Sequence, residues 1–550
     1  MHASKGLIAL TLVALASTSG AAQRRDTRLA DAAERRDGAA IQALVKQKTD
    51  LNAAQPDGAT ALHWVAHWDD VASAELLLKS GANVNAANDA GVTPLALACE
   101  NGSAAMVEAL LKGGANPNAA LLSGETALMT AARSGNAGAV KALIAKGANV
   151  NATESTHGQT ALMWAVSNQH PAIVQTLVEN GADVHARSEV RPRAVHTGNR
   201  FGDRGDSKGA LTMDLGGFTP LLFAARQGDL ESARLLLAAG ATANEQAANG
   251  ASALVVAAHS GQGAFAKLLL ERGADPNAAG AGYSALHAAV LRGDVDLVKA
   301  LLARGANPNT PIAKGTPSRY YSKDWALNVN ALGGATPLWQ ASRYGDVPIM
   351  RALAAAGANI TFTMPDGTTT LMAAVAANNG FGTGDRRERY IGPGDIAPTP
   401  EENERLTREV AAVAIELGAD VNAASQTTGD TALHLAASQA LDSVVQLLVD
   451  KGANIEAANK RGLTPLGAAV VPRPRNPLQI DGPDRRKSTA ELLRRLGAKE
   501  PDPKTLVPPA MPGRVGDYLQ QQQQREQRQQ QQQQGQPEQK PSEPKPPQPQ

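Results

Sequence analysis

The 550-residue chain has one cysteine, few aromatic residues and almost no net charge, and each shortage excludes a class of protein. Cys99 has no second cysteine to pair with, so a fold held by internal disulfides is excluded. Aromatic residues are only 3% of the chain, which favours close packing by alanine and glycine over a core of large rings. Lysine and arginine (53) balance aspartate and glutamate (52), so no overall basic field favours nucleic acid or an anionic membrane.

The chain also lacks an apolar run long enough to cross a membrane. A short run from Gly6 to Ala16 follows Lys5 and is itself followed by small residues up to Ala22. This order is typical of a secretory signal peptide, and it predicts residues 1–22 as that peptide, with cleavage near Ala22. We therefore expect an exported protein, periplasmic or secreted from a bacterium. The alternative is an uncleaved N-terminal segment.

A short phrase recurs along the chain at a nearly fixed interval. It reads Thr-(Ala/Pro)-Leu, with serine sometimes replacing threonine, and about twenty residues later comes Gly-Ala-(Asn/Asp)-x-Asn. Where nothing intervenes, as from Thr60 to Thr93, the interval is 33 residues. The phrase begins at Thr60, Thr93, Thr126, Thr160, Thr219, Ser252, Ser284, Thr336, Thr369, Thr431 and Thr464.

Each part of the phrase has a physical role in a pair of helices. Threonine or serine is a good N-cap, and proline fits the first helical position because no donor is needed there. The leucine and paired alanines that follow predict a narrow helix, and a run such as Leu235–Leu237 predicts a second helix. A glycine such as Gly240 or Gly273 then permits the left-handed conformation that ends a helix. One such pair cannot bury its apolar face alone, so the pairs must stack.

This phrase and its period resemble the ankyrin repeat. The resemblance covers about residues 27–499 and implies an all-α ankyrin-repeat solenoid of stacked helix–turn–helix units with hairpin fingers. Eleven phrase-bearing repeats and a capping repeat over about Asp26 to Asn52 give about twelve repeats.

Departures from the period predict four insertions. Those at about 187–215 and 311–333 lie between repeats and are expected to extend fingers, whereas those at about 379–405 and 471–487 lie between the two helices of a repeat. Insertions in a repeat array often belong to the functional surface. Residues 500–550 are rich in proline and glutamine and are predicted to form a disordered tail.

No catalytic motif is convincing. Gly380 to Gly384 lacks the strand and helix that a phosphate-binding loop needs, and Arg204-Gly205-Asp206 is too short a match to carry weight. His63 and His67 have a metal-ligand spacing but no third ligand, so His63 is interpreted as a structural histidine, like His287 and His434. Cys99 is interpreted as a buried structural thiol. We expect no enzyme activity, no cofactor and no metal.

Aromatic and basic residues gather at the positions that ankyrin-like proteins present to partners. These positions lie seven and eight residues after the phrase threonine, on the finger just before it, and in the second finger insertion. Exposed aromatic side chains with arginine are typical of binding hot spots. The predicted partner-binding residues are His67, Trp68, Arg133, Phe218, Arg226, His259, Tyr283, Arg292, Tyr320, Tyr321, Trp325, Arg343 and Tyr344. An alternative is that some of these side chains pack the insertions onto the stack.

The resemblance implies protein–protein interaction without catalysis. With the signal peptide, it predicts an exported scaffold or adaptor whose concave groove binds a protein or peptide, with no nucleic acid and no membrane span. One alternative is that the insertions build a small ligand or catalytic pocket from His196, Asp203, Asp206, Asp324 and Asp385. Another is a secreted effector that acts on a host protein. The identity of the partner and the oligomeric state stay open.

Overall fold

Each repeat begins where a threonine or serine caps a short helix, as predicted from the sequence. The Thr126 hydroxyl accepts the backbone N–H of Met129 at 3.3 Å, and the Thr93 hydroxyl accepts that of Ala96 at 3.2 Å. Proline occupies the first turn of several of these helices, where its missing N–H costs nothing. The helices that follow are only six to eight residues long in most repeats, so their stability comes from packing rather than from helix propensity.

The computed structural model describes residues 26–196, 210–313, 316–317, 327–328, 333–376, 399–471 and 486–506, and within these ranges the chain is a succession of helix pairs. The first helices of the pairs are α1 (Arg28–Glu34), α3 (Ala61–His67), α5 (Pro94–Glu100), α7 (Ala127–Ser134), α9 (Ala161–Ser167), α11 (Pro220–Gln227), α13 (Ala253–Ser260), α15 (Ala285–Arg292), α17 (Pro337–Arg343), α19 (Thr370–Val375), α22 (Ala432–Ser438) and α24 (Pro465–Val470). The second helices are α2 (Gly38–Lys46), α4 (Val71–Lys79), α6 (Ala104–Lys112), α8 (Ala137–Ala145), α10 (Pro171–Glu179), α12 (Leu230–Ala238), α14 (Gly263–Glu271), α16 (Val295–Ala303), α18 (Val347–Ala355), α21 (Pro400–Glu416), α23 (Asp442–Asp450) and α25 (Arg486–Arg495).

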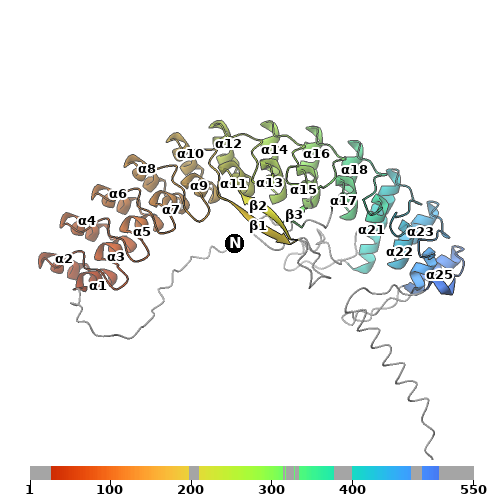
Figure 1. Ribbon diagram of the computed structural model, residues 1–550, viewed down its shortest axis with the longest axis horizontal. Helices are drawn as coiled ribbons and strands as arrows, with labels where there is room; N and C mark the ends of the chain where they lie inside the picture. Colours follow the sequence, from red (N-terminus) through yellow and green to blue (C-terminus); the bar gives the residue numbers. More distant parts are fainter. Residues whose placement is uncertain are drawn as a thin grey trace, which may run out of the picture. The chain divides into compact units, whose positions relative to one another are not determined.

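The contacts of the chain divide it into two compact units. Unit 1 comprises residues 1–340, 351–358 and 382–386, and unit 2 comprises residues 341–350, 359–381 and 387–550. Helices α1 to α16 belong to unit 1, helices α19 to α25 belong to unit 2, and the division passes through α17 and α18. Figure 1 shows the helix pairs of unit 1 side by side in sequence order.

The core of each unit lies between successive repeats. In unit 1, α7 packs against α5 and α9 as well as against its own partner α8. Leu128 and Ala132 on α7 are almost completely buried, as are Ala98 and Ala165 on its neighbours. Burying one leucine side chain contributes about 2 kcal/mol. The small alanines allow the helices to approach closely, which explains how a chain poor in aromatic residues forms a core.

Glycine and asparagine build the turns that join one repeat to the next. Gly147, after α8, has φ +84°, the left-handed conformation predicted for the residue that ends the second helix. The Asn118 amide then bridges two repeats, because its Nδ2 donates to the Gly147 carbonyl at 3.0 Å and its Oδ1 accepts the Asn149 N–H at 2.7 Å. The same bridge recurs at Asn85 and Asn277, so the turn asparagines connect consecutive repeats.

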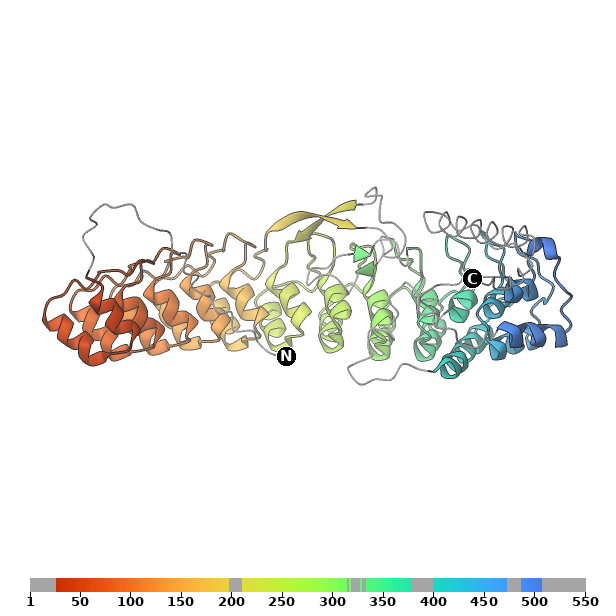
Figure 2. The same ribbon diagram turned by 90° about the horizontal axis from the view of Figure 1, so that it is seen from below.

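Four segments depart from the regular succession of helix pairs. Strands β1 (Val190–His196) and β2 (Ala210–Gly216) pair antiparallel and lengthen one finger, and β3 (Thr316–Pro317) with β4 (Leu327–Asn328) lies in the second finger insertion. Figure 2 shows the β1–β2 hairpin on the finger side of unit 1. Residues 376–399 separate α19 from α21, and residues 471–485 separate α24 from α25.

Two details add to the predicted boundaries. Helix α21 has 17 residues where the other second helices have nine or ten, so the end of the predicted insertion at 379–405 is helical from Pro400. Residues Pro503–Thr505 form a 3₁₀ turn at the start of the predicted tail, and Asp502 caps it by accepting the Lys504 N–H. The predicted signal peptide and the tail after residue 506 lie outside the described residues.

Candidate functional site

The inner face of unit 1 is defined here by four positions in each repeat. These are the finger residue just before the cap threonine or serine, the residue four after it, and the residues seven and eight after it. These positions converge in space, as Arg133 shows. Arg133 lies seven residues after the cap Thr126, and it contacts Glu125, the residue just before that cap. It also contacts Trp164, which lies four residues after the next cap, Thr160. Residues four and seven apart lie on one face of a helix. In Figure 1 the first helices of unit 1 lie on the inner side of the row.

An aromatic cluster lies on the inner face at α3. The rings of Trp64 and Trp68 stack with centroids 6.2 Å apart, and the exposed His67 ring lies 4.5 Å from Trp68. The Arg36 guanidinium lies 3.8 Å from the centre of the Trp68 ring, a cation–π distance. Trp64 donates to the Gln55 Oε1 at 2.6 Å, which fixes its ring. His67 and Trp68, both predicted, therefore belong to one partly exposed aromatic surface.

Arg133 forms the next cluster along the inner face. It is exposed, its Nη2 lies 3.3 Å from the Glu125 Oε1, and its guanidinium carbon lies 5.0 Å from the Trp164 ring centre. The Arg133 side chain is 44% exposed and the Glu125 side chain 15% exposed, so the ion pair is only partly in water. It holds the guanidinium beside the Trp164 ring.

Phe218 and Arg226 form a third cluster, at α11. The Phe218 ring lies 5.5 Å from the ring of Phe223, which is 4% exposed, and the Arg226 guanidinium carbon lies 5.1 Å from Phe223 and 5.8 Å from Phe218. Phe218 and Arg226 are themselves half-buried. An aromatic ring and a guanidinium, both half-exposed and supported from beneath, are the composition of a binding hot spot.

The cluster at α13 and α15 corrects one predicted site residue. His259 and Arg292 are half-buried, and the Arg292 Nε donates to the His259 carbonyl at 2.6 Å. Tyr283 was predicted to face a partner, but its side chain is only 1% exposed, and its ring packs edge-on against His259 at 6.3 Å. Burial raises the pKa of its hydroxyl. Tyr283 therefore packs within the fold, which is the alternative noted for these aromatic residues.

Arg343 and Tyr344, in unit 2, also pack within the fold. Tyr344 is 5% exposed, and Arg343 is half-buried with its guanidinium donating to the Ala376 carbonyl. The prediction that Tyr344 meets a partner is wrong, because its side chain is buried within the fold.

Several predicted residues lie outside the described part of the chain. Among them are Tyr320, Tyr321 and Trp325 of the second finger insertion, the Arg204-Gly205-Asp206 tripeptide and the glycine-rich segment Gly380 to Gly384. For the alternative pocket, Asp203, Asp206, Asp324 and Asp385 lie outside it as well, and only the backbone of His196 is described.

The buried histidines have the structural role predicted for them. The His63 Nδ1 accepts the Thr60 N–H at 3.1 Å, and its Nε2 lies 2.9 Å from the Val92 carbonyl of the next finger. His434 makes the same contacts with Thr431 and Leu463. Burial lowers the pKa of both imidazoles, which are therefore neutral at pH 7.

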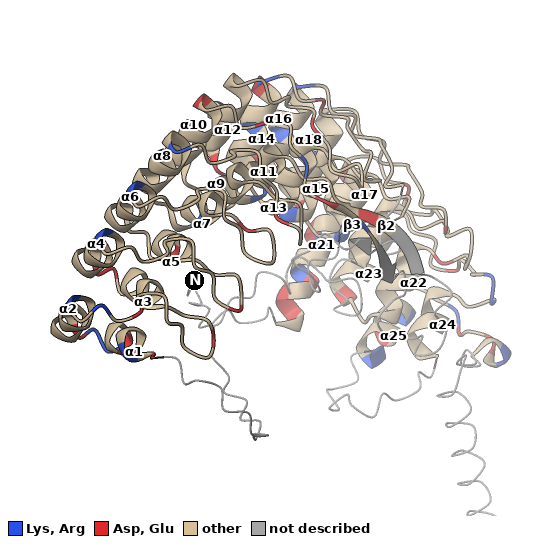
Figure 3. Ribbon diagram, turned by 60° about the vertical axis from the view of Figure 1, so that its left-hand side comes forward, with Lys and Arg blue, Asp and Glu red and all other residues tan. Residues whose placement is uncertain are grey.

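Cys99 is buried in the structure. Burial raises the pKa of the Cys99 thiol to about 12, as expected for an inert structural cysteine. Among the residues that the structure describes, no three histidine, cysteine or acidic side chains gather as a metal site would require. No helix in those ranges is both long and apolar enough to span a bilayer. Figure 3 shows lysine and arginine interspersed with acidic residues along the elements.

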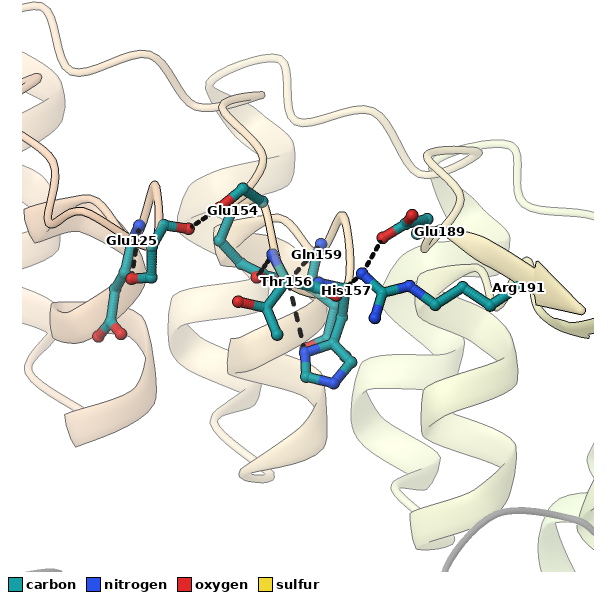
Figure 4. A network of polar contacts seen from close by, with 9 residues as sticks. Glu125, Glu154, Thr156, His157, Gln159, Glu189 and Arg191 are labelled. Carbon is teal, nitrogen blue, oxygen red and sulfur yellow. Dashed lines mark hydrogen bonds and ion pairs between the residues drawn. The ribbon is translucent and has the colours of Figure 1, made fainter. Parts of the chain in front are cut away.

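A polar network fixes the finger next to the β1–β2 hairpin (Figure 4). The Glu154 carboxylate is 4% exposed and accepts the backbone N–H groups of Thr156, His157 and Gln159 at 2.6 to 3.0 Å. The Arg191 guanidinium at the start of β1 donates to the Thr156 carbonyl and to a Glu189 carboxylate oxygen. The root of the hairpin is therefore tied to the preceding finger.

The aromatic residues four positions after the cap are not predicted from the sequence. Trp64, Trp164 and Phe223 support the predicted surface residues from beneath or beside them. Helical spacing could have found them, because a residue four after the cap lies one turn before the residue eight after it.

Comparison with known proteins identifies the family. Residues 29–121, 113–188, 221–312 and 406–475 match the family model described as ankyrin repeats (3 copies), and residues 333–364 match the model of a single ankyrin repeat. The chain belongs to the ankyrin-repeat family. Ankyrin repeats generally mediate protein–protein interaction and are typically non-catalytic scaffolds, which suggests a protein partner.

Curated relatives match this ankyrin-repeat protein over a short stretch only. The neurogenic locus Notch protein of Drosophila melanogaster is 37% identical over 107 residues, and the neurogenic locus notch homolog protein 1 of Xenopus tropicalis is 32% identical over 116 residues. These stretches are 20% and 21% of this chain, and the match spans only 4% of the length of each relative.

Proposed function

We propose that this ankyrin-repeat protein is an exported scaffold that binds a segment of a protein partner on the inner face of unit 1. The observation that carries the proposal is the Phe218–Arg226 cluster. Its ring and guanidinium are half-exposed, and the buried Phe223 supports both from beneath. Partly exposed aromatic and arginine side chains above a rigid support lose little entropy on binding, which is why they dominate interface energetics.

The clusters at Arg133 and Trp68 support an extended rather than a point-like contact. They lie on the same face of unit 1, on α7 and at the end of α3, so a bound segment could contact several repeats in turn. Repeat solenoids offer such continuous surfaces because each repeat presents the same positions.

The test compares two arginines of one repeat. Arg226→Ala removes the inner-face guanidinium, whereas Arg234→Ala removes an exposed arginine from α12, the second helix of the same pair. Proteins captured by each purified variant from a native cell extract are identified by mass spectrometry. We expect Arg226→Ala to lose partners that wild type and Arg234→Ala retain, at unchanged melting temperature. Equal recovery by both variants would reject the inner face as the site.

Export is tested separately. Because residues 1–22 have the composition of a signal peptide, we expect the mature protein to begin just after Ala22. N-terminal sequencing of the protein from the native cells decides this. A chain that still begins at Met1 would remove the periplasmic or secreted assignment and would favour the alternative in which the N-terminal segment is retained.

A further inference from the structure

Five pairs of neighbouring fingers in the described part of unit 1 are joined by the same kind of hydrogen bond. In each case a backbone N–H of one finger donates to a backbone carbonyl near the end of the preceding finger. In unit 1 these bonds are Asp89 to Asp57 at 3.0 Å, Ser155 to Ser123 at 2.8 Å, Glu189 to His157 at 2.6 Å, Ala248 to Gly216 at 3.1 Å and Ala313 to Gly282 at 2.7 Å. In each of these pairs, the part of the finger that leads into the next first helix therefore faces the finger that follows it.

The β1–β2 hairpin is longer than the finger that follows it. The next finger turns at Gly250, whose N–H donates to the Ala247 carbonyl, and its Ala248 N–H reaches Gly216 at the end of β2. Strand β2 extends from Gly216 back to Ala210. Within the part of the chain that the structure describes, Gly216 is the residue of β2 whose backbone bonds to that finger. The edge of β2 that faces the next finger thus extends beyond that finger.

Pro192 determines which backbone groups of β2 point outward. It stands opposite Asp214 in the ladder, and it has no N–H, so this pair is not hydrogen-bonded. Because antiparallel pairs alternate, the bonded pairs are Arg191 with Leu215, Arg193 with Met213 and Val195 with Leu211. The N–H and C=O groups of Ala210, Thr212, Asp214 and Gly216 then point away from β1. The bond from Ala248 to the Gly216 carbonyl agrees with this assignment.

The two edges of the hairpin differ. On β1 the outward residues are Val190, Pro192, Ala194 and His196, and Pro192 removes a donor from the middle of that edge. Proline on an edge strand is a common means of blocking further strand pairing. Strand β2 contains no proline, so its outward donors and acceptors at Ala210, Thr212 and Asp214 form an uninterrupted row.

We propose that the outer edge of β2 binds an extended segment of a protein partner by strand addition. An added strand would continue the pairing that Ala248 begins at Gly216. Backbone hydrogen bonds supply affinity in this mode of recognition, and alternate side chains supply specificity. The exposed Asp214 carboxylate favours a basic side chain opposite it. This inference rests on the proposed function, since it names the form that the bound segment takes.

The position of β2 favours a partner segment over other occupants. Phe218, which belongs to the Phe218–Arg226 cluster, follows the last residue of β2 by two positions. A segment paired with β2 would therefore run directly onto the inner face of unit 1. A second copy of the chain paired through this row of residues would bury far less area than a stable dimer needs.

The experiment uses two cross-strand neighbours. Thr212→Pro removes an outward N–H from β2, and Ala194→Pro removes the outward N–H of the residue directly opposite on β1. Peptides are selected on the wild-type protein from a phage-displayed library of unstructured twelve-residue sequences, and their dissociation constants are measured for each variant. In Thr212→Pro the bound peptide loses one backbone hydrogen bond, and the proline obstructs the added strand. Binding should therefore weaken about tenfold or more. Ala194→Pro should bind within about twofold of wild type.

A second measurement keeps the result independent of hairpin damage. Amide exchange at Val195 and Leu211, which are bonded inside the hairpin, shows whether each variant retains it. N-methylation of single residues of a selected peptide should weaken binding at every second position only, the pattern of an added strand.

The outcomes separate this inference from the proposed function. Peptides that lose affinity in Arg226→Ala but not in Thr212→Pro would leave the inner-face function standing and overturn the strand-addition site. Failure to select any peptide, or equal losses in Thr212→Pro and Ala194→Pro, would overturn it too. Self-association that Thr212→Pro abolishes, or peptide binding that appears only when residues 314–332 are deleted, would assign the edge to a second copy or to the second finger insertion instead.

Discussion

In unit 1 the insertions lengthen fingers, whereas in unit 2 they separate the two helices of a repeat. The β1–β2 hairpin is attached by polar contacts: the Arg187 guanidinium donates to the Gly217 carbonyl at 2.9 Å and to the Gln246 carbonyl at 2.8 Å. In unit 2 the end of the insertion forms the first turns of α21 from Pro400, and Val410 of the same helix is buried. The β1–β2 hairpin is thus attached by hydrogen bonds to neighbouring fingers, whereas the extended start of α21 belongs to a helix that is attached by apolar packing.

The difference bears on function. A finger extended by hydrogen-bonded strands presents backbone donors and acceptors along its edge, which a partner strand can use. A lengthened helix satisfies its own backbone and can offer only side chains. The β1–β2 hairpin is therefore better suited to bind an extended segment, and the extended start of α21 to brace a neighbouring helix.

The largest expected effect concerns His287, at the root of the second finger insertion in unit 1. It is fully buried, and burial lowers its pKa to about 4, below the ordinary value of 6.5. Between these values the unfolded chain binds a proton that the folded chain does not, so the free energy of unfolding decreases as the pH falls from about 6.5 to about 4. The full loss is about 3 kcal/mol. Urea unfolding at pH 7 and pH 4.5 measures it.

The matched variant is His287→Gln, which keeps an acceptor near the Ser284 N–H but does not titrate. Its unfolding free energy should vary less with pH than that of wild type. An unchanged pH dependence would show that the acid sensitivity of the repeats arises elsewhere.

A second prediction compares two glycines with positive φ in unit 1. A Cβ on Gly216, at the hairpin root with φ +102°, would collide with the Glu189 carbonyl oxygen, whereas a Cβ on Gly273, with φ +81° after α14, would meet nothing within 4 Å. We expect Gly273→Ala to cost about 1 kcal/mol, the strain of the left-handed conformation alone. Gly216→Ala should cost about 2 kcal/mol or more, because the hairpin root must also move.

Amide exchange is the measurement for this pair. Exchange at Arg191 and Leu215 should accelerate in Gly216→Ala and stay as in wild type in Gly273→Ala. If the two variants behaved alike, the hairpin would not be held at Gly216.

The smallest expected effect tests the attachment in unit 2. Helix α23 has Leu441 at its N-cap, which offers no side-chain acceptor, and the Glu404 carboxylate from the extended part of α21 accepts the Ser443 N–H at 2.6 Å instead. Glu404→Ala should lower the unfolding free energy by about 1 kcal/mol, the usual value of a lost cap. Glu409→Ala, at an exposed position of the same helix, is the control and should change little. Equal losses of unfolding free energy in Glu404→Ala and Glu409→Ala would mean that the extended start of α21 contributes through helix propensity alone.

Much of the fold could be predicted because its determinants are local. The cap at Thr126, the left-handed Gly147 and the asparagine turn at Asn118 each act over a few residues, so the sequence shows them directly. The places of the insertions follow from counting along the chain. By contrast, the helical start of α21 at Pro400 was not predicted, because the insertion was located by its length and not by its conformation.

The candidate site could be predicted only in part. Arg226 and Trp68 lie on the inner face where the period places them, but Tyr283 and Tyr344 at comparable positions are buried. The period gives the direction of a side chain, whereas its exposure depends on what neighbouring repeats place over it. For the same reason Phe223 was overlooked, although it supports both Phe218 and Arg226.

The sequence by itself determined that helix pairs stack in series, since caps, turns and apolar faces repeat every 33 residues and no single pair can bury its apolar face. Only the tertiary structure decided which backbone polar groups stay available to a partner. The row of outward backbone groups at Ala210, Thr212 and Asp214 arises because one finger extends beyond the next, and Pro192 fixes its register. Such a row depends on the relative lengths of neighbouring elements, which no local pattern of residues records.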